Sequence, residues 1–78
     1  MTLKIKYFGM AAEASARSQE ELENQYTNIK ELKTALSTKY PKLASINFKM
    51  AVNHSLVGEN YSLTGNEEIA LLPPFAGG

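Results

Sequence analysis

The chain opens on a strict alternation of apolar and polar positions. Residues 3–9 have the sequence LKIKYFG, in which one face carries Leu3, Ile5 and Tyr7 and the other carries Lys4 and Lys6. A period of two with β-branched and aromatic residues predicts a strand. Phe8 falls on the lysine side, so it is either covered by another element or an exposed contact.

Two weaker elements follow. Residues 10–18, MAAEASARS, are rich in alanine and predict a short helical turn. Residues 19–26, QEELENQY, predict a weak strand with one aliphatic side chain. Glu20, Glu21 and Glu23 resemble a paired-carboxylate site, but charged residues on a polar strand are usually exposed, so we interpret them as a solvated face.

The clearest helical pattern spans residues 27–41, TNIKELKTALSTKYP. Thr27 or Asn28 can cap its start, and Glu31 follows Asn28 at the spacing of a capping box. The predicted buried face has helical spacing and consists of Ile29, Leu32, Ala35, Leu36 and Tyr40. Pro41 ends the helix because the residue before a proline is disfavoured in the helical conformation.

The second half of the chain contains three further strand segments. After a connector at residues 42–47, FKMAVN predicts a strand with Phe48, Met50 and Val52 on one side. Residues 54–67 predict a short strand and two turns, at residues 58–60 and 65–66. The final segment, EIALLP, predicts a buried strand from Ile69 to Leu72.

This order of elements predicts an α+β fold with one main helix on one face of a small mixed sheet of four to five strands. A parallel central pair of the first and last strands would give the ubiquitin-like β-grasp topology, although periodicity alone does not fix it. A ferredoxin-like sandwich would need a second full helix, which the pattern lacks. We expect a β-grasp domain at residues 1–72 and an extended tail at residues 73–78.

The composition excludes several classes of partner and site. Eight basic and eight acidic residues cancel in a chain of 78 residues, without a basic stripe, so we expect neither nucleic acid nor a membrane as partner. No run approaches the roughly 20 apolar residues of a membrane helix. The absence of cysteine excludes disulfides, thiolate metal sites and a thiol nucleophile. We expect a cytoplasmic protein.

Candidate catalytic side chains are few. All eight acidic residues are glutamate, and the one histidine, His54, is best interpreted as a solvent-facing turn residue. Its neighbour Ser55 cannot pair with it directly, because adjacent residues of a strand point to opposite faces. Since the sequence contains no glycine-rich phosphate loop, metal-ligand cluster or triad, we expect neither side-chain catalysis nor a metal site.

The closing sequence, LLPPFAGG, has unusual mechanics. Pro73 and Pro74 fix φ and remove two backbone donors, so the chain leaves the sheet and runs extended. Residues 73–78 can reach about 20 Å. Gly77 and Gly78 carry no side chain and can thread a narrow channel, where an activated terminal carboxylate, for example an acyl-adenylate, could react. A frayed tail is the alternative.

Residues 50–78, MAVNHSLVGENYSLTGNEEIALLPPFAGG, resemble the C-terminal half of the small subunit of molybdopterin synthase. That family has a similar Ala-Val-Asn step, a glycine-rich acidic turn, an apolar strand and a terminal Pro-Pro-x-x-Gly-Gly. Residues 3–16 resemble its first strand and short helix, and the likeness is weakest at residues 17–48. TGNEE departs from the Asp-Gly-Asp type of turn common in the family.

The resemblance implies a β-grasp sulfur carrier for molybdenum cofactor biosynthesis. An adenylating enzyme of the ubiquitin-activating type would use ATP to activate the Gly78 carboxylate, which would then become a thiocarboxylate. The tail would enter the large synthase subunit and pass sulfur to a pyranopterin precursor. The carrier itself would bind no cofactor, and the catalytic side chains would belong to the large subunit.

By position, Gly78 would bear the sulfur and Gly77 would give a narrow approach. The resemblance makes the remaining tail residues its guide, namely Pro73, Pro74, Phe75 and Ala76. Phe8, Met10 and Leu72, with Phe75, are our candidates for an apolar docking patch, although the first three could equally belong to the core. Three other functions stay open: a sulfur carrier for thiazole synthesis, a ubiquitin-like modifier conjugated through Gly78, and a small binding module whose tail is incidental.

Overall fold

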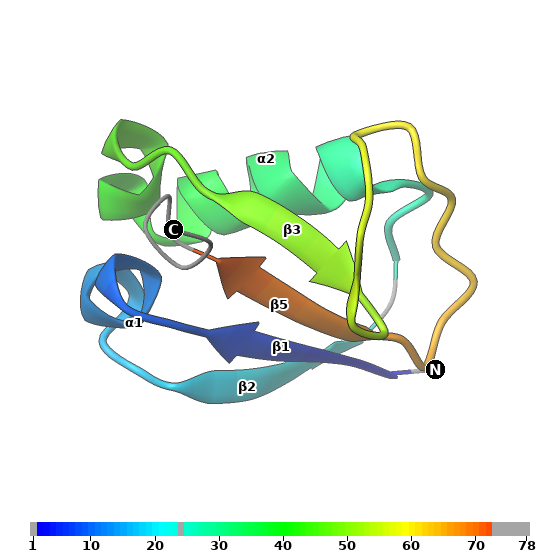
Figure 1. Ribbon diagram of the computed structural model, residues 1–78, viewed down its shortest axis with the longest axis horizontal. Helices are drawn as coiled ribbons and strands as arrows, with labels where there is room; N and C mark the ends of the chain where they lie inside the picture. Colours follow the sequence, from blue (N-terminus) through cyan, green and yellow to red (C-terminus); the bar gives the residue numbers. More distant parts are fainter. Residues whose placement is uncertain (1, 24, 73–78) are drawn as a thin grey trace.

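The computed structural model describes residues 2–23 and 25–72 and contains one mixed sheet with helices against it (Figure 1). The strands are β1 (Thr2–Tyr7), β2 (Gln19–Glu23), β3 (Lys49–Val52), β4 (Ser55–Leu56) and β5 (Glu68–Leu72). The helices are α1 (Met10–Ser15), α2 (Ile29–Lys39) and the 3-10 helix η1 (Pro41–Ser45). The predicted tail lies outside the described residues.

The sheet has the strand order β2-β1-β5-β3-β4, with β1 and β5 parallel at its centre. β2 pairs antiparallel with β1, and β3 pairs antiparallel with both β5 and β4. Figure 1 shows α2 crossing one face of the sheet. This is the β-grasp topology, so the predicted fold class is confirmed. We call the face that α2 covers the inner face and the opposite one the outer face.

The core lies between the inner face and α2. Alternation along β1 buries Leu3, Ile5 and Tyr7 as predicted, and β5 adds Ile69 and Leu71. Burying such side chains stabilises a fold by about 1.5–3 kcal/mol each.

The helix α2 supplies the other side of this core through Ile29, Leu32 and Leu36, as its spacing predicts. The predicted connector after it is partly wrong, because residues 41–45 form η1 and bury Leu43 completely. Pro41 begins that helix, where its missing N–H is not needed.

The predicted cap of α2 is confirmed. Asn28 Oδ1 accepts a hydrogen bond from the Glu31 N–H at 2.9 Å, and the Glu31 carboxylate accepts one from the Thr27 N–H at 2.7 Å. α2 ends at Lys39, so Tyr40 stands just beyond it and is half-buried.

The turn before β5 is organised by the buried Glu67. Its carboxylate accepts hydrogen bonds from the Thr64 N–H at 2.7 Å, the Thr64 hydroxyl at 2.8 Å and the Gly65 N–H at 2.7 Å. Burial opposes ionisation, but these bonds outweigh it and hold the pKa of the Glu67 carboxyl below its usual range. The turn therefore closes around an internal carboxylate.

Within the described ranges, no helix has the length and apolarity of a membrane span.

Candidate functional site

The carboxyl ends of the two central strands lie side by side, and β5 ends there at Leu72. β1 and β5 run parallel with Tyr7 opposite Leu71, and the Phe8 N–H continues the ladder by donating to the Leu71 carbonyl at 3.3 Å. Phe8 and Leu72 therefore emerge side by side. Leu72 is the last described residue, so the predicted tail residues Pro73 to Gly78, including Phe75, lie outside the described structure.

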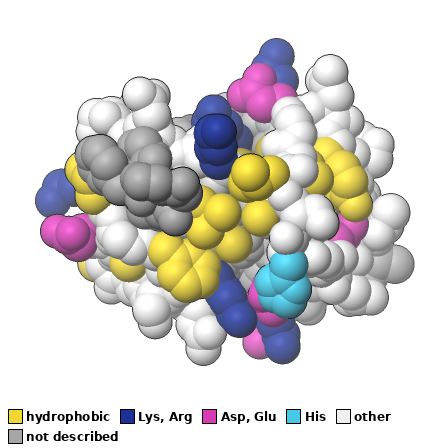
Figure 2. All heavy atoms as spheres, in the orientation of Figure 1, with side chains coloured by type: hydrophobic (Ala, Val, Ile, Leu, Met, Phe, Trp, Pro, Cys, Tyr) yellow, Lys and Arg dark blue, Asp and Glu magenta, His cyan; other side chains and the backbone are white. Residues whose placement is uncertain are grey.

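An apolar patch covers the outer face beside this point. Since Tyr7 and Leu71 point inward, alternation turns Phe8 and Leu72 outward. The register adds residues of the neighbouring strands on the same face, so the outer patch consists of Phe8, Ala51, Leu56, Ala70 and Leu72. Figure 2 shows hydrophobic side chains gathered on this face between lysine or arginine side chains. An exposed apolar cluster with a polar rim is typical of a protein interaction surface.

The exposed fractions separate the large side chains of the patch from the core, whereas Ala51 at the centre of the patch is itself buried. Phe8 is 45% exposed and Leu56 is 61% exposed, and Leu72 is half-buried. Met10 is 46% exposed, so neither Phe8 nor Met10 is a core residue. Met10 lies on α1, where it lines a shallow hollow with Ile46, so the structure places it off the sheet face that carries Phe8 and Leu72.

Three patch residues were not predicted from the sequence pattern, namely Ala51, Leu56 and Ala70, and Leu56 is the largest and most exposed of them. Asn53 and His54 have φ values of 49° and 74°, which makes the connection between β3 and β4 a tight two-residue turn. That turn pairs Val52 with Ser55 and Ala51 with Leu56, so Leu56 shares the outer face with Ala51. The sequence signal was this two-residue spacing, which fixes the register of a hairpin. His54 is a solvent-facing turn residue, as predicted.

Charged groups border the patch. Lys6 Nζ lies 3.5 Å from Glu68, and His54 Nε2 lies 3.2 Å from the other oxygen of that carboxylate. Lys49 stands directly opposite Leu72 in the β3–β5 ladder and is exposed. The outer face therefore combines an apolar centre with one edge where Lys6 pairs with Glu68 and another edge where Lys49 is exposed.

On the inner face, at the carboxyl end of β1, a polar cluster surrounds Glu20. Its carboxylate accepts hydrogen bonds from the hydroxyls of Tyr7 at 2.5 Å and Tyr40 at 2.7 Å, and from Lys39 at 2.9 Å. Arg17 completes the Glu20 cluster at 3.2 Å. The predicted solvated face is therefore wrong for Glu20, whose side chain is only 6% exposed, whereas Glu21 and Glu23 are exposed as predicted.

The electrostatics of the Glu20 cluster suit a structural anion rather than a general base. Burial raises the pKa of the Glu20 carboxyl, but the hydrogen bonds from Tyr7, Lys39 and Tyr40 outweigh burial and hold it below its usual range. Burial and the adjacent carboxylate raise the pKa of the Tyr7 phenol. Glu20 therefore stays ionised and accepts protons poorly at neutral pH.

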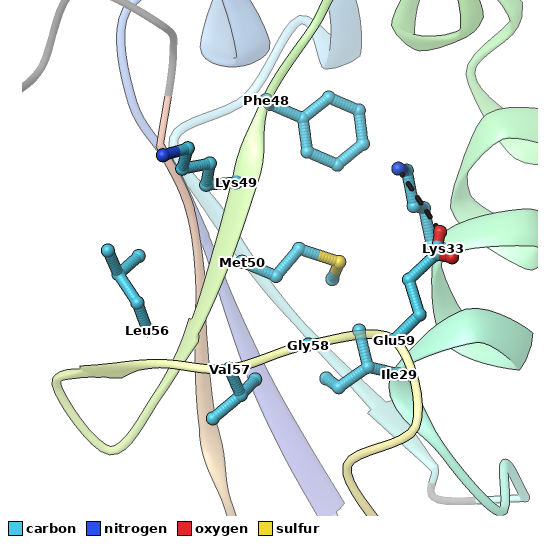
Figure 3. A pocket seen from close by; sticks show the side chains of 9 residues that line it. All are labelled: Ile29, Lys33, Phe48, Lys49, Met50, Leu56, Val57, Gly58 and Glu59. Carbon is cyan, nitrogen blue, oxygen red and sulfur yellow. Dashed lines mark hydrogen bonds and ion pairs between the residues drawn. The ribbon is translucent and has the colours of Figure 1, made fainter.

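A second hollow lies around β3, between that strand, α2 and residues 56–59 (Figure 3). Lys49 and Leu56, on the outer side of β3, also line it. Its apolar wall contains Ile29, Phe48, Met50 and Val57, and the cavity measures about 400 Å³. Lys33 pairs with Glu59 at 3.5 Å across its rim. This charge pair is already satisfied, and in the described part of the chain no group of three or more potential metal ligands occurs. The hollow could therefore hold an apolar group, but its described lining contains no nucleophile–base pair.

Comparison with known proteins gives a family and several structural neighbours. The model of the ThiS family matches residues 5–78. A Pyrococcus furiosus protein described as molybdopterin converting factor subunit 1 has a TM-score of 0.86 at 19% identity, with 95% of this chain and 98% of that chain covered. SAMP1 from Haloferax volcanii has a TM-score of 0.82 at 19% identity, with both chains covered completely.

A solved complex is also among the neighbours. It is described as subunits 1 and 2 of the molybdopterin-converting factor from Helicobacter pylori, and its matching chain has a TM-score of 0.71 at 25% identity, with both chains covered completely. These similarities extend over the β-grasp domain and support the predicted fold independently of the sequence pattern.

Proposed function

The chain belongs to the ThiS family, and we propose that it carries sulfur on its last residue, Gly78, for the biosynthesis of the molybdenum cofactor. The observation that carries this proposal is the position of the outer patch. The parallel β1–β5 pair brings exposed Phe8 next to Leu72, the residue from which the tail continues. A partner that covers the outer patch would therefore hold the root of the tail at a fixed place.

The proposed chemistry takes place at the Gly78 carboxylate. A ubiquitin-activating-type adenylyltransferase transfers AMP from ATP to that carboxylate and releases pyrophosphate. A sulfur nucleophile at the oxidation level of sulfide then displaces AMP and leaves a thiocarboxylate. Because this chain has no cysteine, its terminus is the place where sulfur can be held covalently. Because the proposed adenylation consumes ATP, we propose that the protein works in the cytoplasm.

The receiving partner in this proposal is the large subunit of the molybdopterin-converting factor. The solved complex of subunits 1 and 2 from Helicobacter pylori supports it, because the similar chain there sits with such a subunit. The Glu20 cluster and the hollow beside α2 supply no nucleophile–base pair, so we assign the catalytic side chains of sulfur transfer to the partner. Pro73 to Gly77 would guide the terminus into its channel.

A second candidate function is that of a ubiquitin-like modifier, joined through Gly78 to lysines of other proteins. The similarity to SAMP1, a small archaeal modifier protein, favours keeping this candidate. Activation would be the same up to the adenylate, and the two functions would part when sulfide or a lysine amine displaces AMP. The family match also keeps thiazole synthesis as a destination for the sulfur.

Mass spectrometry after activation tests the proposal. The protein is incubated with the adenylyltransferase, ATP and a sulfide source, and we expect a gain equal to the mass difference between sulfur and oxygen, located on Gly78 by fragmentation. Addition of the large subunit and the pyranopterin precursor should return the original mass and form molybdopterin. Sulfur on another residue would contradict the carrier mechanism, and stable adducts on many proteins would favour the modifier.

A further inference from the structure

The two lysines that border the outer patch differ in their electrostatic surroundings. Lys6 lies in β1 opposite Ala70, and its ammonium is compensated by Glu68 at 3.5 Å. Lys49 lies in β3 opposite Leu72, is exposed, and has no ion-pair partner among residues 2–23 and 25–72. The outer patch therefore has one neutralised edge and one edge with an unpaired positive charge.

The carboxylates of the described chain do not reach Lys49. Glu68 already contacts Lys6 and His54. Glu59 lines the same hollow as Lys49, but its carboxylate pairs with Lys33 at 3.5 Å. The exposed glutamates of β2 lie three strands away across the sheet. At about 4.8 Å per strand that separation is roughly 14 Å, which exceeds the Debye length of about 8 Å at physiological salt.

The Lys49 side chain is directed toward the patch. Figure 3 shows Lys49 and Leu56 on one side of β3, and Phe48 and Met50 on the other. A lysine in this position can lay its aliphatic stem along apolar neighbours while the ammonium remains at the rim. Any protein surface that covers Leu56 and Leu72 will therefore also approach the Lys49 ammonium and remove part of its water.

We propose that Lys49 binds a carboxylate of the large subunit, placed beside the mouth of the channel that receives the tail. An ammonium that loses water without gaining a partner opposes association, so a partner that covers the patch needs an acceptor opposite Lys49. Since Lys49 lies opposite Leu72 in the β3–β5 ladder, that acceptor lies beside the residue from which the tail continues. The inference rests on the proposed function and adds that the partner face has an apolar centre and an acidic edge.

This arrangement also assigns Lys49 a role in the rate of association. Charges at the rim of an interface steer the encounter and determine its salt dependence more than its final affinity. An uncompensated charge contributes more to steering than one already paired within its own chain, as Lys6 is with Glu68. Lys49 should therefore account for most of the salt dependence of association with the large subunit.

The experiment compares charge variants at two sites. Lys49→Gln removes the charge, Lys49→Glu reverses it, and Lys30→Glu is the matched control, because Lys30 is an exposed lysine of α2 without an ion pair in the described chain. Binding of each variant to the large subunit is measured by titration calorimetry and stopped-flow mixing at low and high salt. Thermal melts confirm that each variant is folded.

We expect Lys49→Gln to weaken binding about tenfold and Lys49→Glu about a hundredfold at low salt, mainly through slower association. The difference between them should shrink at high salt, because screening weakens exposed charges. Lys30→Glu should change binding by no more than about threefold. Replacement of the partner's acidic residue by lysine should restore binding to Lys49→Glu and not to Lys30→Glu.

The outcomes separate this inference from the proposed function. If Lys49→Glu binds as Lys30→Glu does while the wild type binds and receives sulfur, the Lys49 inference is wrong and the sulfur carrier stands. If the wild type neither binds the large subunit nor gains sulfur on Gly78, the proposed function fails and the inference fails with it.

Discussion

Tyr7 and Phe8 are neighbours in sequence but belong to regions of opposite character. Tyr7 points into the inner side, where the Glu20 carboxylate accepts hydrogen bonds from two hydroxyls and from two cationic side chains. Phe8 points to the outer side and remains 45% exposed. The inner region has its polar groups paired, whereas in the described part of the chain the outer region has exposed apolar side chains and a lysine without an ion pair. The contrast indicates that one side stabilises the fold and the other awaits a partner.

Deletion of Gly78 is the change with the largest expected effect on function. It should abolish sulfur transfer completely, because the reactive carbonyl moves by about 3.5 Å. The melting temperature should stay the same, since a terminal glycine buries almost no area. Thiocarboxylate formation is followed by mass spectrometry, and a variant with one added residue serves as a second probe. Full activity in either variant would contradict a role of the terminus.

Glu20→Ala tests the inner side. It leaves the Tyr7 and Tyr40 hydroxyls without their acceptor and two cations without a counter-ion, so we expect a loss of about 2–4 kcal/mol in the free energy of unfolding. Glu21→Ala is the matched control, because Glu21 is an exposed residue of the same strand. Denaturant unfolding measures both. Equal free energies of unfolding for the two variants would show that the Glu20 cluster does not stabilise the fold.

Phe8→Ala and Leu56→Ala test the outer patch. Full burial of such a side chain contributes roughly 1.5–3 kcal/mol, so each should weaken binding to the large subunit about ten- to hundredfold. Stability should fall little, because both side chains are exposed. Phe75→Ala should weaken binding similarly if the tail adds its own contact. Calorimetric titration measures each change, and Tyr61→Ala, at an exposed aromatic outside the patch, is the control.

The smallest effect is a pH dependence that belongs to the inner side. A carboxyl whose pKa is lowered in the folded state stabilises the fold above its unfolded pKa, near 4.3, and this contribution is lost as pH falls through the folded value. The pKa values of the Glu20 and Glu67 carboxyls are both lowered in the folded state, so the free energy of unfolding should decrease below about pH 4.5. Glu20→Gln should flatten part of that decrease. Acid titration of both proteins by circular dichroism checks it, and identical profiles would contradict the assignment.

The strand and helix patterns predicted most of the fold, because each rests on local periodicity. Leu3, Ile5 and Tyr7 alternate into the core, and Asn28 caps α2 through Glu31, as their spacing indicates. The Glu20 cluster was not predictable in the same way. Its members come from β1, β2, the connection between α1 and β2, and the C-terminal end and cap of α2, and only the folded chain brings them within hydrogen-bond distance.

The site was predicted in part for the same reason. Phe8 stood out because it breaks a polar face, and the structure confirms that it is exposed. Leu56 did not stand out, since a single leucine in a turn-rich segment has no periodicity of its own, and its face depends on the register set by Asn53 and His54. The tail residues 73–78 lie outside the described structure, so their roles remain predictions.

The central position of β5 has a mechanical consequence. A pull on the tail passes into the sheet at Leu72 and acts along the axis of β5, which is hydrogen-bonded to β1 on one side and to β3 on the other. Such a load shears the bonds of both ladders together instead of opening them one after another. The domain should therefore resist force applied at Leu72, because β5 cannot separate from one neighbouring strand without breaking its bonds to the other.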